Sequence, residues 1–142
     1  MIYHVNEAAF TLPEFGFADR TVNVLEATGP EGQKLGLLVA RSPYAPGKGL
    51  RDAVAEHQKQ ERRTLRAWSV LCERDSVVDG VPAVEVQIRW RSDEGMVYQR
   101  QAHIGLADVV LLFVANAPLE DREACDACMD QLLQTLSLRS GG

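Results

Sequence analysis

The residues of this chain that could take part in covalent or metal chemistry are three cysteines and three histidines. Cys125 and Cys128 have the spacing of a redox motif, with Asp126 and Ala127 between them. Reactive pairs of this kind normally open a helix, where the helix dipole lowers the thiol pKa, whereas these two fall inside the apolar stripe of a predicted helix. We therefore interpret them as small buried apolar side chains. A zinc site is not expected either, since it would need two further ligands.

The histidines His4, His57 and His103 are far apart in the sequence, and none lies beside a nucleophile motif. The chain contains no Gly-x-Ser-x-Gly, no His-Glu-x-x-His and no glycine-rich phosphate loop, and Gly47-Lys48-Gly49 is typical of a plain turn. We therefore expect a protein without enzymatic activity, metal or cofactor. The alternative is an enzyme that uses scattered residues such as His57 and His103, which would require a pocket with converging titratable groups.

Composition narrows the class of protein. The 142 residues fit one domain, which we expect to span residues 1–142. The net charge of -5 and the scattered basic residues argue against nucleic-acid binding, which needs concentrated Lys and Arg. The first residues lack the pattern of a secretory signal, and no apolar run approaches the ~18 residues that suggest a membrane span. Because an odd number of cysteines is typical of free thiols in a reducing compartment, we expect a cytoplasmic protein that does not itself insert into membranes.

Turn signals and hydrophobic alternation divide the chain into strands and two helices. The expected strands are a hairpin over 2–12, single strands over 21–27 and 35–41, and a meander over 68–115. A helix without Pro or Gly is predicted over 50–66. The stretch 109–114 is apolar on both faces, which predicts a central strand.

The second helix is predicted to begin at Asn116 and Pro118, with Glu120 and Asp121 near its positive end. Its apolar stripe recurs at helical spacing and consists of Cys125, Cys128, Met129, Leu132, Leu133 and Leu136. The predicted fold class is α+β, a mostly antiparallel sheet of about six to eight strands packed with two main helices.

The strands over 21–27 and 35–41 carry apolar residues on both sides. In the first of them, Val22 and Val24 point one way and Leu25 points the other way. Two helices cannot easily cover both faces of such a sheet. One face is therefore expected to keep apolar surface for a partner.

Three glutamines lie where apolar residues would be expected. Gln99 and Gln101 share one side of a strand with Val97, and Gln58 interrupts the apolar stripe of the first helix. Taken singly, each is typical of a surface residue. Together they indicate an apolar face with amide groups, which suits a peptide or a helix.

Several short motifs, in order along nearly the whole chain, resemble the Eag-type (effector-associated) chaperones of type VI secretion, a DcrB-related group with a PsbP-like fold. The motifs are Tyr3-His4-Val5-Asn6-Glu7, Leu12-Pro13, Asp19-Arg20-Thr21-Val22-Asn23-Val24, Arg41, Gly80-Val81-Pro82-Ala83, Trp90 and Tyr98-Gln99-Arg100-Gln101. The resemblance implies a PsbP-like sandwich.

The resemblance also implies a function. Members of this group are cytosolic homodimers without enzymatic activity. They bind and shield the N-terminal transmembrane segments of a cognate effector and help to load it onto the secretion spike. Carried over by position, the effector-binding residues would be Val22, Val24, Leu37, Val39, Gln58, Gln99 and Gln101.

Two other readings remain open. One is a PsbP-like partner-binding or regulatory domain without a membrane-protein client, in which a tight dimer buries the apolar surface. The other is a periplasmic DcrB-type relative, which would carry a signal or lipoprotein sequence. We expect the chaperone, because the paired apolar strand faces argue against a domain without a client and the first residues lack the signal pattern of a periplasmic relative.

Overall fold

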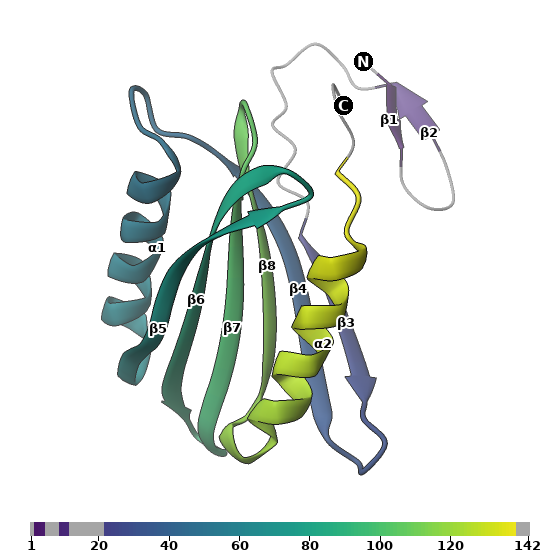
Figure 1. The fold of residues 1–142 in the computed structure, drawn as a ribbon, viewed down its shortest axis with the longest axis vertical. Helices are drawn as coiled ribbons and strands as arrows, with labels where there is room; N and C mark the ends of the chain where they lie inside the picture. Colours follow the sequence, from purple (N-terminus) through teal and green to yellow (C-terminus); the bar gives the residue numbers. More distant parts are fainter. Residues whose placement is uncertain (1, 5–8, 12–21, 139–142) are drawn as a thin grey trace.

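A six-stranded antiparallel sheet with a helix against each face forms the main part of the structure (Figure 1). The computed structural model describes residues 2–4, 9–11 and 22–138. The strands lie in the order β3-β4-β8-β7-β6-β5. The elements are β3 (Asn23–Thr28), β4 (Lys34–Pro43), α1 (Leu50–Thr64), β5 (Arg66–Val78), β6 (Val81–Ser92), β7 (Gly95–Gly105), β8 (Val109–Pro118), the 3-10 turn η1 (Leu119–Asp121) and α2 (Arg122–Thr135). The predicted α+β class is confirmed.

Most predicted elements are found close to their expected places. The hairpin over 2–12 corresponds to β1 (Ile2–His4) paired with β2 (Ala9–Thr11) in a separate two-stranded sheet. The residues of the family motifs that fall within 5–8 and 12–21 lie outside the described residues. The predicted meander corresponds to β5 to β8, and β8 is central, between β4 and β7. At the β5–β6 turn, Asp79 and Gly80 have positive φ values of 48° and 77°, as a two-residue hairpin turn requires.

The predicted start of the second helix, at Asn116 and Pro118, is wrong. Strand β8 continues through Pro118, and α2 begins only at Arg122, after the η1 turn. Asn116 is paired with Gly36 of β4 on one side and with Gln99 of β7 on the other. This pairing with two neighbouring strands outweighs the local helix-start signal.

Alternating residues along the central strands build two separate cores on opposite faces of the sheet. The core beneath α1 consists of Val54, Val84, Val86 and Ile88, with Leu50, Leu65, Trp68 and Trp90 packed around them. The larger core, beneath α2, includes Tyr98, Ala102, Ile104, Phe113, Ala115, Cys125 and Met129. Cys125 and Met129 are fully buried, which confirms the predicted inward stripe of α2.

A buried arginine joins α2 to the sheet. Arg100 of β7 is 4% exposed, and its guanidinium lies 2.8 Å from Glu85 and 2.6 Å from Asp130. Asp126 accepts a hydrogen bond of 2.6 Å from the hydroxyl of Tyr98. Burial alone would raise the pKa of Glu85, but its hydrogen bond with Arg100 and the nearby positive charges lower that pKa overall. The arginine thus keeps Glu85 ionised inside the fold.

Replacing Arg100 with Met is expected to lower the free energy of unfolding by about 3–5 kcal/mol, because Glu85 is left buried without its principal partner. The double variant R100M/E85L should be more stable than R100M alone, since it removes both buried charges. The exposed ion pair between Arg66 and Asp93 provides the control, and R66A should cost at most about 1 kcal/mol. Urea unfolding at neutral pH measures all three, and equal losses for R100M and R66A would contradict this account.

Candidate ligand-binding face

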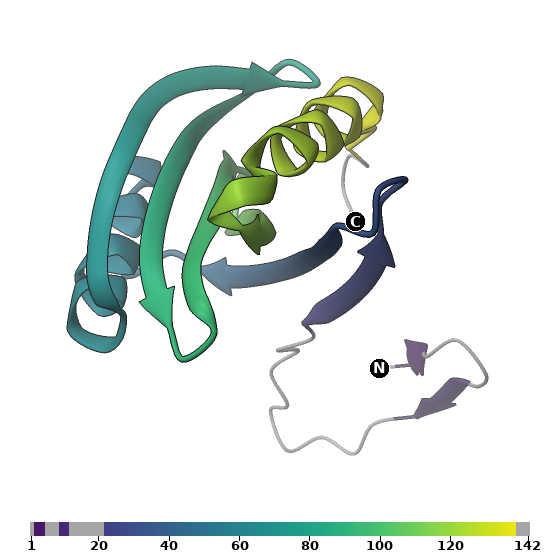
Figure 2. The ribbon, with the colours of Figure 1, turned by 90° about the horizontal axis from the view of Figure 1, so that it is seen from below.

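Helix α1 covers only half of its face of the sheet. It packs on β5, β6 and β7 at one margin of the curved sheet, while β3 forms the other margin (Figures 1 and 2). On the same face, β3, β4 and β8 carry apolar side chains that belong to neither core. We call this surface the open face, and it consists of Val24, Leu38, Ala40 and Leu112, together with Val114, which is buried between its neighbours. Val24 is 68% exposed.

The strand register divides the predicted apolar site residues between two faces. Val24 is paired with Leu38, so these two share the open face. Leu37 and Val39 lie on the opposite face, packed against the α2 core. The grouping of Val24 with Leu37 and Val39 is therefore wrong, because side chains alternate along a strand. Val22 precedes β3 and is exposed.

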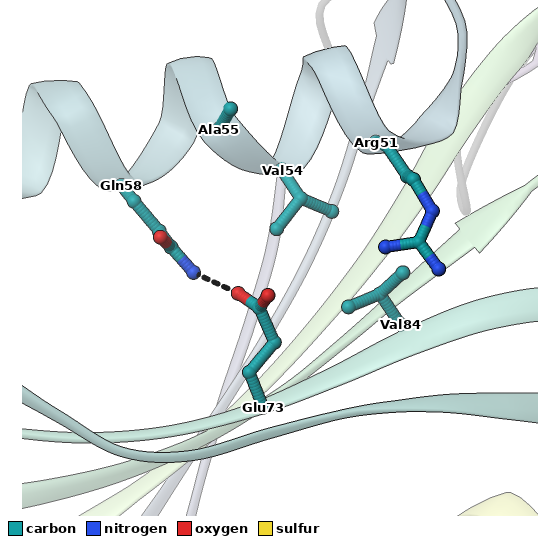
Figure 3. A pocket seen from close by; sticks show the side chains of 6 residues that line it. All are labelled: Arg51, Val54, Ala55, Gln58, Glu73 and Val84. Carbon is teal, nitrogen blue, oxygen red and sulfur yellow. Dashed lines mark hydrogen bonds between the residues drawn. The ribbon is translucent and has the colours of Figure 1, made fainter.

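The three predicted glutamines are also separated. Gln101 is fully buried beneath α1, and Gln99 is half-buried on the same side of β7. The side chain of Gln58 is directed away from both, toward the edge strand β5, where its amide donates to Glu73 (Figure 3). The small pocket at this point also contains Val54 and Arg51. Gln58 therefore lies on the far side of α1 from the open face.

A buried polar network connects α1 to β7. Gln101 Nε2 donates to Glu61 Oε2 at 2.7 Å, and Gln101 Oε1 lies 3.0 Å from His103 Nε2. The ring of His57 on α1 meets the ring of His103 edge-on, with 5.1 Å between centroids. Sequence reasoning missed Glu61 and His103 as members of this site. The available signal was the interruption of the α1 apolar stripe at His57 and Glu61.

A row of amides leads from this network onto the open face. Gln99 is paired across the sheet with Asn116, and Asn116 with Gly36. A Cβ at Gly36 would lie 2.8 Å from Asn116 Oδ1, so the glycine leaves room for the amide. The open face is thus an apolar surface crossed by a polar row, and it can take an apolar segment that also presents polar atoms.

The buried member of the cysteine pair has surroundings that do not favour reactivity. Burial raises the pKa of the Cys125 thiol to about 12, so this cysteine stays protonated. Within residues 2–4, 9–11 and 22–138, no group of three or more His, Cys, Asp or Glu side chains is arranged to hold a metal. In the same ranges, α1 and α2 have 15 and 14 residues and neither could span a bilayer.

The network predicts a pH-dependent stability. Burial, and second the charge of His57, lowers the pKa of His103 to about 3, whereas an unfolded histidine has a pKa of about 6.5. The fold therefore binds this proton less well than the unfolded chain. The stabilisation is fully present above about pH 6.5 and is lost as the pH falls toward 3, by about 1.4 kcal/mol per pH unit.

Urea unfolding of the protein and of H103Q between about pH 7.5 and 5 checks this. The variant retains an amide donor for Gln101, and its free energy of unfolding should fall less steeply with pH than that of the unmodified protein. His57 faces His103 from α1, Glu61 lies beside His57, and both are present in both proteins. Parallel pH dependences would show that His103 is not the group that titrates.

Several solved structures share this fold. A Pseudomonas aeruginosa protein of unknown function, PA94, matches with a TM-score of 0.81 at 21% identity, over 98% of this chain and 96% of that one. LpqN of Mycobacterium tuberculosis, which is involved in cell envelope biogenesis, matches with a TM-score of 0.59 at 7% identity, over 84% of this chain and 85% of that one. Cyanobacterial PsbP (CyanoP) from Synechocystis sp. PCC 6803 matches with a TM-score of 0.58 at 8% identity, over 92% of this chain and 98% of that one.

Sequence comparison places the chain in a family. No curated protein sequence matches it significantly. The DcrB family model matches residues 7–135, a stretch that contains all six strands of the main sheet and both helices. The PsbP-like fold expected from the motifs is confirmed by the likeness to CyanoP. The chain therefore belongs to the DcrB family.

Proposed function

We propose that this protein is a cytoplasmic, non-enzymatic chaperone of the Eag type, which acts as a homodimer. It binds and shields the N-terminal transmembrane segments of a type VI secretion effector and helps to load the effector onto the secretion spike. The open face holds the apolar segment, and the protein does not enter the membrane itself.

The observation that carries this proposal is the uncovered apolar half of the α1 face. Val24, the second residue of β3, is 68% exposed, and it stands beside Leu38, which is half-buried. Soluble proteins rarely leave a contiguous apolar patch exposed unless it is a binding site. A transmembrane segment presents ~20 apolar residues and aggregates in water unless such a surface covers it.

The amides next to this surface favour a helical membrane segment over a purely apolar ligand. Membrane helices commonly contain Ser, Thr and other small polar residues, which would lie unpaired against an all-aliphatic face. Gln99 and Asn116 are half-buried beside Val114 and Leu38, within reach of such groups. The open face can therefore hold a polar atom of the client as well as its apolar side chains.

Co-expression with the effector encoded beside this gene tests the proposal directly. The effector is produced with its N-terminal hydrophobic segment either intact or deleted, and the complexes are captured and weighed by native mass spectrometry. Capture that depends on the segment, with two copies of this chain for each effector, is the expected result. Equal capture without the segment would instead favour a PsbP-like partner-binding domain without a membrane-protein client.

Charged substitutions locate the binding surface. V24D and L38D should each weaken capture of the segment by more than about tenfold, because they place an unpaired carboxylate against the apolar client. V77D is the matched control, since Val77 is 69% exposed on β5, outside the open face. Capture that is equally weak for V77D, or unchanged for V24D and L38D, would place the client elsewhere. Unfolding curves for all three variants confirm that each one folds.

A further inference from the structure

A carboxylate buried beneath α1 determines how the amides of β7 are oriented. Glu61 is 8% exposed, and its Oε2 accepts a hydrogen bond of 2.7 Å from Gln101 Nε2. A carboxylate accepts hydrogen bonds and donates none, so the amide nitrogen of Gln101 must face Glu61. Gln101 Oε1 is thereby turned toward His103 Nε2, at 3.0 Å.

This orientation extends along β7 in both directions. Because Gln101 Oε1 can only accept, His103 Nε2 must donate, which selects the Nε2–H tautomer of the imidazole. On the other side, Gln101 Nε2 lies 3.4 Å from Gln99 Oε1, so the oxygen of Gln99 faces inward. Gln99 Nε2 then keeps both of its hydrogens, and no residue in the described part of the chain accepts from them.

The network contains a destabilising group that the fold does not need in order to form. The second oxygen of Glu61, Oε1, is buried without a partner among the described residues, and His57 Nε2 lies 3.5 Å from Oε2. A buried carboxylate with an unpaired oxygen destabilises a fold relative to an aliphatic residue of similar size. Natural proteins keep such destabilising features mainly at functional sites. We therefore assign Glu61 a task beyond packing α1 on the sheet.

We propose that Glu61 is a positioning residue that turns the open face into a hydrogen-bond donor. Gln99 offers its amide hydrogens beside Asn116, and the apolar segment bound there presents acceptors. Such acceptors are hydroxyl or ether oxygens, or backbone carbonyls freed at a break in a helix. This inference rests on the proposed function, because it takes the segment to be the chaperone's client.

The orientation of the network can be tested without any client. Long-range proton–nitrogen NMR spectra of the full-length ¹⁵N-labelled chain at about pH 7.5 report the tautomer of each neutral histidine. We expect His103 to show only the Nε2–H form, and E61Q to add an Nδ1–H form, because a glutamine at position 61 can donate as well as accept. E56Q, an exposed change on the same helix, should leave the spectrum as it is. An Nδ1–H form in the unmodified protein, or no change in E61Q, overturns the positioning role.

The donor character of the face is tested with two synthetic helices of about 20 apolar residues. They differ at one central residue, which is either O-methylserine, whose ether oxygen only accepts, or its isostere norvaline. The residue is moved through about four successive positions so that it samples every side of the helix. At one position, the protein should bind the ether peptide about fivefold more tightly, the ratio expected for one net hydrogen bond.

Matched variants connect the preference to the network. The fivefold preference should disappear in Q99M and shrink in E61Q, whereas Q87M, a half-buried amide on the opposite side of the sheet, should retain it. Equal binding of both peptides at every position overturns the donor inference and leaves the chaperone proposal standing. Binding of neither peptide overturns both proposals, while the NMR result still decides the orientation of Gln101.

Discussion

One α-helix is about 10–12 Å wide, whereas neighbouring strands are about 4.8 Å apart, so a single helix covers two or three strands. This sheet has six strands and one helix on each face. About half of each face is therefore left without a helix. The position of α1 over β5 to β7 leaves β8, β4 and β3 uncovered on that side. The rest of the candidate site follows from this mismatch of widths.

The two faces of the sheet differ in the side chains that this mismatch leaves without a covering helix. Opposite α1, the positions of β6 beyond the α2 core are polar, and Gln87 and Arg89 meet water there at no cost. On the α1 face the uncovered positions are apolar instead, and Val24 and Leu38 have no helix above them. On the α2 side the gap over β6 is thus a solvated polar surface, with Leu25 exposed at the β3 margin, whereas on the α1 side the gap over β3 and β4 is apolar. This difference is why the open face, and not its opposite, is the candidate site.

Strand β7 places a polar side chain on each face of the sheet. Arg100 points toward α2, where Glu85 and Asp130 neutralise it. Its neighbour Gln101 points toward α1, where Glu61 and His103 take both ends of its amide. Because adjacent side chains alternate, one central strand supports an ionic contact that holds α2 and a neutral network that reaches the open face. Each of them leaves one buried atom without a partner among the described residues, Arg100 Nε in the ionic contact and Glu61 Oε1 in the network.

Local patterns in the sequence were sufficient for the fold class and for most elements, although not for the start of α2. The turn signals and alternation of the meander over 68–115 and the apolar stripe of α2 depend on neighbours in the chain, and the structure has strands and a helix there. The composition of the site depended on pairings that local patterns do not contain. Whether Val24 lies beside Leu38 or beside Leu37 and Val39 is decided by strand register, where a shift of one residue reverses every side chain. Likewise, Gln101 meets Glu61 only because α1 packs across β7, 40 positions apart in sequence, so only the tertiary structure could select the residues of the open face.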